Sequence, residues 1–229
     1  MKKKNLLHIV YCIDTEGPMT ESISATFKRL RQIYKVNLPA SKKNLIKLQN
    51  KKIKLNGLEH EISESFSKKL LSYNDNWNKI NEMLKIITSK KFRNNFKDSF
   101  GKGLRYNWFI MDHVGFKDNP RKRDLGFSKI WNKYMSHYKT NNKKKVDGFH
   151  FHHHPIPFSK SANHCATHFF NKNPIIYDIL NRRIIDHAWF PSVFRAGFHA
   201  IRPDSHWFLE QFIPFDYSNQ SVTMKKIIS

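Results

Sequence analysis

Four of the five residues from 150 to 154 are histidines, and imidazole is the commonest metal ligand in proteins. The N-terminal string YCIDTEGP adds two carboxylates, Asp14 and Glu16. Two imidazoles and one carboxylate leave a coordination position open, which is typical of a catalytic rather than a structural zinc site. These residue types therefore predict a metal-dependent hydrolase, provided that the two distant segments meet in space.

The histidine run admits two ligand geometries. If the chain turns after residue 150, His150 and His154 converge on one metal ion, as i and i+4 residues do in a helical turn. If the chain stays extended, alternation by two places His150, His152 and His154 on the same side. Pro155 biases His154 toward an extended backbone. The local pattern leaves both geometries open.

The expected strands place these polar residues at strand ends. Residues 5–13 form an apolar, aromatic-rich run that ends at Asp14, which is typical of a buried parallel strand. We expect further strands at residues 106–111, 147–151, 190–194 and 213–217, and helices at residues 22–34, 63–73, 77–88, 131–138, 174–187 and 204–212. Strands that alternate with helices predict an α/β fold with a mainly parallel sheet.

The chain of 229 residues is expected to form a single domain, residues 1–229, with a helical Lys-rich insertion at about residues 20–100. Its net charge of +23 would suit a nucleic-acid binder. However, the lysines are spread along the chain, and no nucleic-acid-binding motif accompanies them, so we expect no specific nucleic-acid partner. We also expect no membrane span and no signal peptide, and hence a cytoplasmic protein.

Four short motifs, taken in order, resemble a known family. DTEGP follows the first expected strand, HxxxHP follows a later one, and FRAG and PFDYS come after them. The same order occurs in the polysaccharide deacetylases, the NodB-homology superfamily of carbohydrate esterases. The strings WFIMDHVGF, NPRKRDLGF, FRAGFHAIRPDS and FLEQFIPFDYSNQS look most like the WbmS-like branch, which is associated with bacterial surface-polysaccharide gene clusters. The resemblance spans roughly residues 9–221.

The resemblance implies a distorted (β/α) barrel with a divalent metal, most typically zinc, at the carboxyl ends of the strands. It implies that Asp14 is the general base and that Arg195 orients it. Glu16 matches the carboxylate metal ligand, and His150 and His154 match the two histidine ligands. Asp14 would accept a proton from the attacking water, whose pKa a bound metal lowers toward ~7.

The remaining matches concern the substrate and the general acid. Asp216 falls in a motif that lines the substrate groove, and we expect Tyr217 and His152 to contact the substrate as well. The family usually supplies a late histidine as general acid, whereas no histidine follows His206 in this chain. Either the barrel is truncated or divergent at its C-terminal end, or His199 or His206 replaces that acid.

The sequence thus predicts a hydrolase of C–N bonds that removes an acetyl group from an N-acetylated sugar or polysaccharide precursor. Its setting would be surface-polysaccharide (O-antigen or lipopolysaccharide) biosynthesis. The unmatched acid predicts weakened or absent turnover with metal binding retained. A catalytically inactive carbohydrate-binding relative is the first alternative, and a basic nucleic-acid-binding protein is the second.

Overall fold

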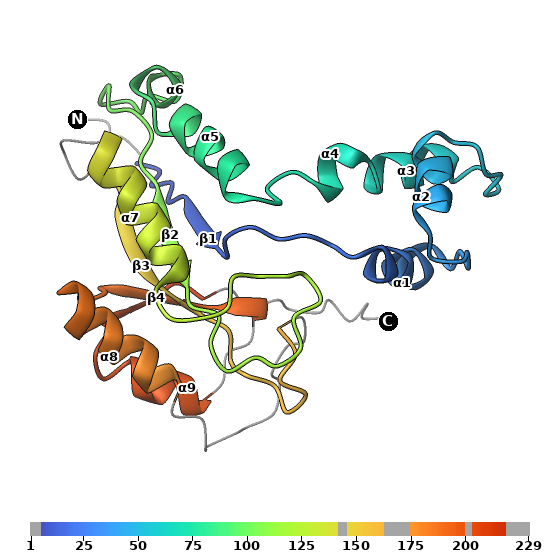
Figure 1. Cartoon of the computed structure of the whole chain (residues 1–229). Coiled ribbons are helices and arrows are strands. Elements are labelled where there is room, and N and C mark those ends of the chain that lie inside the picture. The colour runs from blue at the N-terminus through green and yellow to red at the C-terminus, as the bar shows by residue number, and fades with distance from the viewer. Residues whose placement is uncertain (1–5, 142–145, 163–174, 200–202, 219–229) are drawn as a thin grey trace, which may run out of the picture.

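The structure, a computed structural model, describes residues 6–141, 146–162, 175–199 and 203–218 (Figure 1). Within these ranges the chain forms one five-stranded sheet in the order β1-β2-β3-β4-β5, and every neighbouring pair is parallel. The strands are β1 (Cys12–Thr15), β2 (Asn107–Met111), β3 (Gly148–His153), β4 (Val193–Ala196) and β5 (Phe215–Asp216). The predicted α/β fold with a parallel sheet is confirmed at this level.

Helices fill the connections between the strands. They are α1 (Ile23–Tyr34), α2 (Lys42–Gln49), α3 (Glu59–Ser65), α4 (Lys68–Leu71), α5 (Trp77–Ile87), α6 (Lys90–Asn94), α7 (Lys129–Asn141), α8 (Ile175–His187) and α9 (Pro203–Leu209), with the 3-10 turn η1 (Gly197–His199) after β4. Polar residues begin several of them: the side chains of Ser22, Ser41 and Asn76 each accept a hydrogen bond from the backbone N–H three residues later. Such caps satisfy N–H groups that the first helical turn leaves unpaired.

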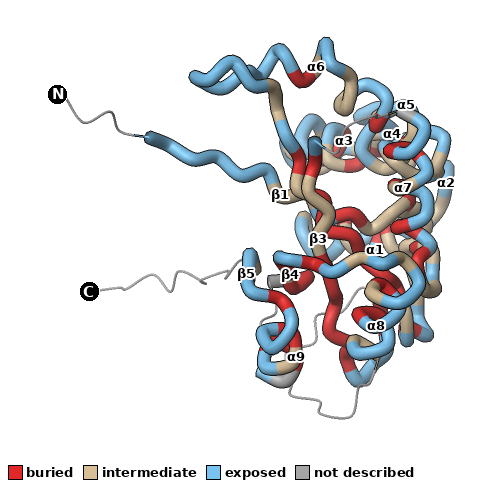
Figure 2. Tube along the Cα trace, turned by 90° about the vertical axis from the view of Figure 1, so that its left-hand side faces the viewer, coloured by how far each residue is buried: buried red, intermediate tan, exposed pale blue. Residues whose placement is uncertain are grey.

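Helices α5, α7, α8 and α9 cover one face of the sheet. Figure 2 shows α7 and α8 on the same side of β1 and β3. One core joins α5 and α7 to the strands, with Leu84 and Trp108 at its centre, and a second joins α8 and α9 to β3 and β4 through Phe151 and Phe194. Burying these large side chains is the main stabilising contribution to this layer.

The opposite face of the sheet carries polar residues. Successive side chains of a strand point to opposite faces, and paired residues on neighbouring strands point to the same face. Because Asp14 pairs with Phe109, and Phe109 with His150, these three side chains share the face opposite the helices. His152 and Arg195 are paired as well, and His152 follows His150 by two residues. Residues from four separate strands therefore meet on this side.

Helices α1 to α4 lie beside the sheet and have a core of their own, in which Leu30, Ile62 and Phe66 are fully buried. Two connecting segments, residues 16–22 and 72–76, run side by side between this helical lobe and the sheet (Figure 1). The backbone N–H of Met19 donates to the carbonyl of Asn74 at 3.2 Å. The predicted helical insertion at residues 20–100 therefore has two parts. Helices α1 to α4 form the lobe, whereas α5 packs on the sheet.

Two strand boundaries differ from the prediction in a way that matters for function. The first strand begins at Cys12 rather than at residue 5, and the Tyr11 carbonyl just before it still accepts the backbone N–H of Asn107, the first residue of β2, at 3.0 Å. Leu7 is accordingly 82% exposed. The third strand continues to His153, two residues beyond the predicted end. The histidine run is therefore extended, and alternation by two decides which imidazoles share a face.

Candidate metal site

An ion pair between Asp14 and Arg195 joins strands that are not neighbours in the sheet. Arg195 Nε lies 2.8 Å from Oδ1 and 3.1 Å from Oδ2 of Asp14. Strands β1 and β4 are three spacings apart, or roughly 14 Å in a flat sheet, which is farther than these two side chains can bridge. The sheet is therefore strongly curved, with Asp14 and Arg195 on its concave face.

Glu16, His152 and His154 converge beside this ion pair, with ligand atoms that all lie within 4.8 Å of one another. The Nε2 atoms of His152 and His154 are 3.2 Å apart, and Glu16 Oε1 is 3.4 Å from His154 Nε2. Ligands at 2.0–2.1 Å from a tetrahedral zinc ion are separated by about 3.3 Å. The three side chains could therefore hold a metal ion with little rearrangement.

Burial keeps the two imidazoles of this group in the neutral form that binds metals. The His152 side chain is 1% exposed and the His154 side chain 3% exposed. Burial lowers the pKa of His152, and burial together with the nearby His152 and His113 rings lowers that of His154 well below 6.5. Both rings thus offer lone pairs at neutral pH.

The tautomer of His152 follows from its second hydrogen bond. His152 Nδ1 donates to the main-chain carbonyl of Arg195 at 2.8 Å, across the β3–β4 pair. The proton on Nδ1 leaves Nε2 as the acceptor atom, directed toward His154. Metal-binding histidines commonly use the other ring nitrogen in this way to fix ring orientation.

The structure differs from the sequence prediction in the choice of histidine. His150, predicted as a ligand, lies one strand repeat before the group: its Nε2 is 3.0 Å from Asn107 Oδ1 and its ring packs on Phe109 at 5.0 Å. His152, predicted as a substrate contact, takes the expected place of His150 beside His154. The difference arises because β3 stays extended through His153, as the second of the two predicted geometries required.

The predicted base Asp14 lies next to the candidate metal ligands and is open to solvent. Its side chain is 36% exposed, compared with 21% for Glu16. Asp14 Oδ1 lies 3.9 Å from His152 Nδ1. A carboxylate that is held by an arginine, borders the candidate ligands and remains accessible is suitably placed to accept a proton from a bound water molecule.

Two residues that the sequence prediction did not assign hold Glu16. Arg123 Nε donates to Glu16 Oε2 at 2.9 Å, and His113 Nε2 donates to the Glu16 main-chain carbonyl at 3.1 Å. Both are buried, and burial lowers the pKa of His113 to about 4. His113 lies in the motif WFIMDHVGF and Arg123 in the motif NPRKRDLGF. The family resemblance therefore included both segments, but it did not indicate that these two side chains contact Glu16.

The predicted substrate residues lie farther from this group. Asp216 pairs with Phe194, so it faces α9, where its Oδ2 is 3.4 Å from His206 Nε2. Tyr217 lies nearer: its main-chain carbonyl accepts a hydrogen bond from Arg195 Nη1 at 3.1 Å. Of the two candidate acids, His206 therefore packs on the helix-covered face, and the side chain of His199 lies outside the described residues.

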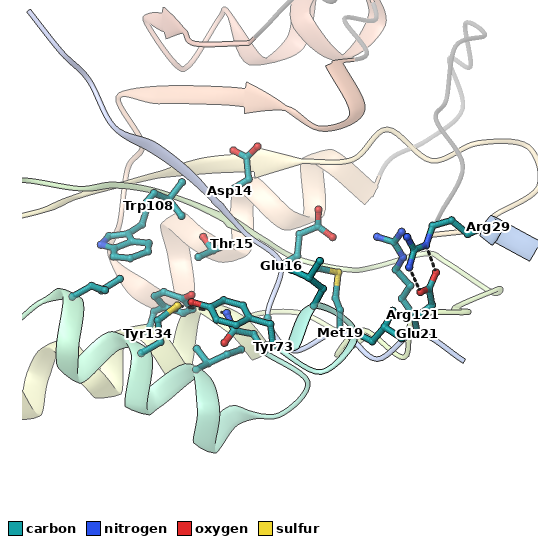
Figure 3. A pocket seen from close by; sticks show the side chains of 18 of the residues that line it. Asp14, Thr15, Glu16, Met19, Glu21, Arg29, Tyr73, Trp108, Arg121 and Tyr134 are labelled. Atoms are coloured by element: carbon teal, nitrogen blue, oxygen red, sulfur yellow. Dashed lines mark hydrogen bonds and ion pairs between the residues drawn. The ribbon is translucent and has the colours of Figure 1, made fainter. Parts of the chain in front are cut away.

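A pocket of about 620 Å³ adjoins the site at the edge of β1. Figure 3 shows the Asp14 and Glu16 carboxylates on one side of the strand and the rings of Trp108 and Tyr134 on the other. Arg121 lines the pocket as well. Neither His152 nor His154 lines it, so the pocket is a neighbour of the candidate metal site and does not contain it.

Comparison with family models, with curated proteins and with solved structures gave no match to this chain. None of the described helices combines the length and the apolar character that crossing a bilayer requires. The function is therefore inferred from the geometry of the candidate site.

Proposed function

We propose that this chain is a metal-dependent deacetylase that acts on an N-acetylated sugar during surface-polysaccharide assembly. The single observation that carries the proposal is the convergence of Glu16, His152 and His154 beside the Asp14–Arg195 ion pair. This combination of two neutral imidazoles, one ligand carboxylate and one separate accessible carboxylate fits metal-assisted hydrolysis. The strong curvature of the sheet supports the barrel type that the resemblance implies.

Each residue has a definite task in this proposal. Glu16, His152 and His154 would hold the metal, for which the N/O ligand set and the near-tetrahedral spacing favour zinc. Bound there, zinc would lower the pKa of a water ligand and polarise the acetyl carbonyl group.

Asp14 accepts the proton of the attacking water on a carboxylate oxygen. Arg195 restricts that carboxylate to one orientation through contacts with both oxygens. It also balances the negative charge when the acetyl carbonyl is attacked nearby. Such positioned proton transfer typically contributes between about 10²-fold and 10⁴-fold to a rate.

A second candidate function is carbohydrate binding without turnover. Its support is the placement of His206 on the helix-covered face, away from Asp14. An amide needs its leaving nitrogen protonated, and His206 does not lie where it would serve this step. An ester substrate releases a better leaving group, so O-acetylated sugars belong in the same assay.

The test begins with metal content. Zinc should be stoichiometric in the wild type and in His150→Gln, and should fall sharply in Glu16→Gln, His152→Gln and His154→Gln. His150 is the matched control, because it is a half-buried histidine of the same strand. Equal zinc in the wild type and in all three ligand variants would overturn the metal site.

Acetate release from N-acetylated and O-acetylated sugars then separates the two candidate functions. Deacetylation by the wild type, reduced at least 100-fold in Asp14→Asn with zinc retained, would establish the enzyme. Sugar binding with no acetate release from either substrate class would establish the inactive relative. Asp178→Asn, an exposed aspartate on α8, serves as the control for the charge change.

A further inference from the structure

The segment between β2 and α7, residues 112–128, donates two hydrogen bonds to Glu16. Arg123 holds one carboxylate oxygen, Oε2, at 2.9 Å, while His113 holds the main-chain carbonyl of the same residue at 3.1 Å. Thus both the backbone and the side chain of Glu16 are fixed by one stretch of chain. The proposed hydrolysis assigned no role to this segment.

The segment is itself firmly anchored. At its start, Asp112 makes a fully buried ion pair with Arg183, at 2.9 Å and 3.1 Å, and accepts the backbone N–H of Ser128 at 2.9 Å. Near its end, Asp124 accepts a hydrogen bond from Trp77 Nε1 at 2.6 Å. Arg123 is 5% exposed. A buried guanidinium on an anchored segment has little freedom to leave its partner.

The two oxygens of Glu16 are therefore not equivalent. Oε2 faces Arg123, whereas Oε1 lies 3.4 Å from His154 Nε2 and faces the candidate metal position. We propose that Arg123 is a positioning residue that makes Glu16 bind the metal ion through Oε1 alone. This proposal rests on the metal site proposed above. The chemical class of the ligand is a divalent cation of the zinc type.

The consequence for the site is a free coordination position. A carboxylate that binds through both oxygens takes up two positions, and so competes with the water that hydrolysis requires. An arginine on Oε2 prevents this, because a hydrogen-bonded oxygen is less available to the metal. The positive charge of Arg123 also repels a cation, so the coordination number has to be measured alongside the metal affinity.

The test compares Arg123→Gln with Arg121→Gln. Both variants remove one positive charge from the same segment, yet in the described part of the chain Arg121 makes no side-chain ion pair. Zinc affinity is measured by chelator competition, and coordination by the visible absorption of the Co²⁺-substituted protein. We expect Arg123→Gln to bind zinc 10-fold to 100-fold more weakly, as loss of a partner of a metal ligand commonly does. Arg121→Gln should match the wild type.

The cobalt spectrum separates positioning from general damage to the fold. Loss of the restraint on Oε2 would raise the coordination number, so Arg123→Gln should give weaker visible bands than the wild type, for which we expect a four-coordinate Co²⁺ ion. Arg123→Lys, which keeps one charged donor, should restore part of the affinity. A wild-type cobalt spectrum together with wild-type zinc affinity in Arg123→Gln would overturn the proposal.

Two further results keep the outcome unambiguous. If Arg123→Gln does not fold, as judged by circular dichroism, Arg123→Met decides, because it removes the donor and keeps an apolar side chain of similar length: affinity and spectrum both equal to wild type would contradict positioning. If zinc binding in the wild type does not depend on Glu16, His152 and His154, the metal site proposed above has failed. If binding depends on them and Arg123→Gln changes nothing, only the role of Arg123 has failed.

Discussion

His152 and Arg195 are joined by a 2.8 Å hydrogen bond from the imidazole Nδ1 to the main-chain carbonyl, across adjacent strands. Residue 195 thus serves both halves of the candidate site. Its backbone orients a histidine of the candidate metal site, and its side chain holds Asp14. Because the two tasks use different atoms, a side-chain substitution can separate them.

We expect Arg195→Gln to lose activity while it keeps its metal. The main-chain carbonyl still accepts from His152, so zinc affinity should stay within about threefold of the wild type. Acetate release should fall by about 10²-fold to 10⁴-fold, because Asp14 loses its restraint and its balancing charge. Arg31→Gln, an exposed arginine of α1, controls for the charge change. Parallel loss of zinc and activity would contradict this division of tasks.

Metal removal should lower stability in a way that depends on zinc concentration. A ligand that binds only the folded state at a thousand times its Kd contributes about 4 kcal/mol. For a chain of this length that corresponds to a Tm change of roughly 8–16 °C. Thermal unfolding with excess zinc and with chelator measures it. His154→Gln should show the same Tm in both conditions, and a shift equal to that of the wild type would place the stabilising zinc elsewhere.

The buried ion pair between Arg93 and Asp147 should be a major determinant of stability. Two hydrogen bonds at 2.6 Å join them, Trp108 Nε1 donates to Asp147 at 3.3 Å, and Tyr138 donates to Asp147 as well. Burial alone would raise the pKa of Asp147, but the bonds from Arg93 and Tyr138 outweigh it and lower that pKa. Removing one partner leaves the other charge buried and unpaired.

We therefore expect Arg93→Leu to reduce the free energy of unfolding by about 3 kcal/mol or more. Urea denaturation at neutral pH measures the loss. The exposed Arg105, which lies just before β2, provides the control, and Arg105→Leu should change stability by no more than about 0.5 kcal/mol. Equal effects in the two variants would mean that the buried pair contributes no more than a surface charge.

His137 should make part of the stability pH-dependent. Its ring is buried on α7, its Nε2 lies 3.1 Å from Thr88 Oγ1, and burial with a contribution from Lys85 lowers its pKa below 6.5. The unfolded chain then binds a proton more readily than the folded chain. This stability is fully present above pH 6.5 and is lost as the pH falls below it.

The measurement is the slope of unfolding free energy against pH between pH 7.5 and 5.5, with chelator present so that metal release does not contribute. His137→Gln should have a slope smaller by up to about 1.4 kcal/mol per pH unit, which corresponds to one proton. The exposed His60→Gln is the control. An unchanged slope in His137→Gln would show that the ring titrates equally in both states.

The sequence predicted the position of the site in the sheet correctly, but it did not predict which histidines would converge there. Parallel strands end at one edge of the sheet, so Asp14, Glu16 and Arg195 were expected to meet, and the structure brings them together. The choice between His150 and His152 depended on one boundary, the end of β3. Strand ends are set by the length of the neighbouring strands, which local patterns do not reveal.

The contacts of His113 and Arg123 with Glu16 could not be predicted, for a different reason. Residues 112–128 follow no regular periodicity, so nothing in their order indicates which side chains turn inward. Arg123 stands in the basic triplet Arg121-Lys122-Arg123, whose members look alike in sequence. Only the path of the segment, fixed by the pairs Asp112–Arg183 and Asp124–Trp77, distinguishes the buried arginine from its neighbours.

Gly197 should be required for the position of His154. A Cβ atom added at this glycine, which follows β4, would overlap the His154 ring at Cδ2 and Nε2. Gly197→Ala must therefore displace the imidazole that the metal site needs, and zinc affinity should fall at least 10-fold, as judged by chelator competition. In a His154→Gln background the same change should reduce zinc affinity no further. Wild-type affinity in Gly197→Ala would show that zinc binding does not depend on the His154 ring in this position, and would contradict its assignment as a ligand.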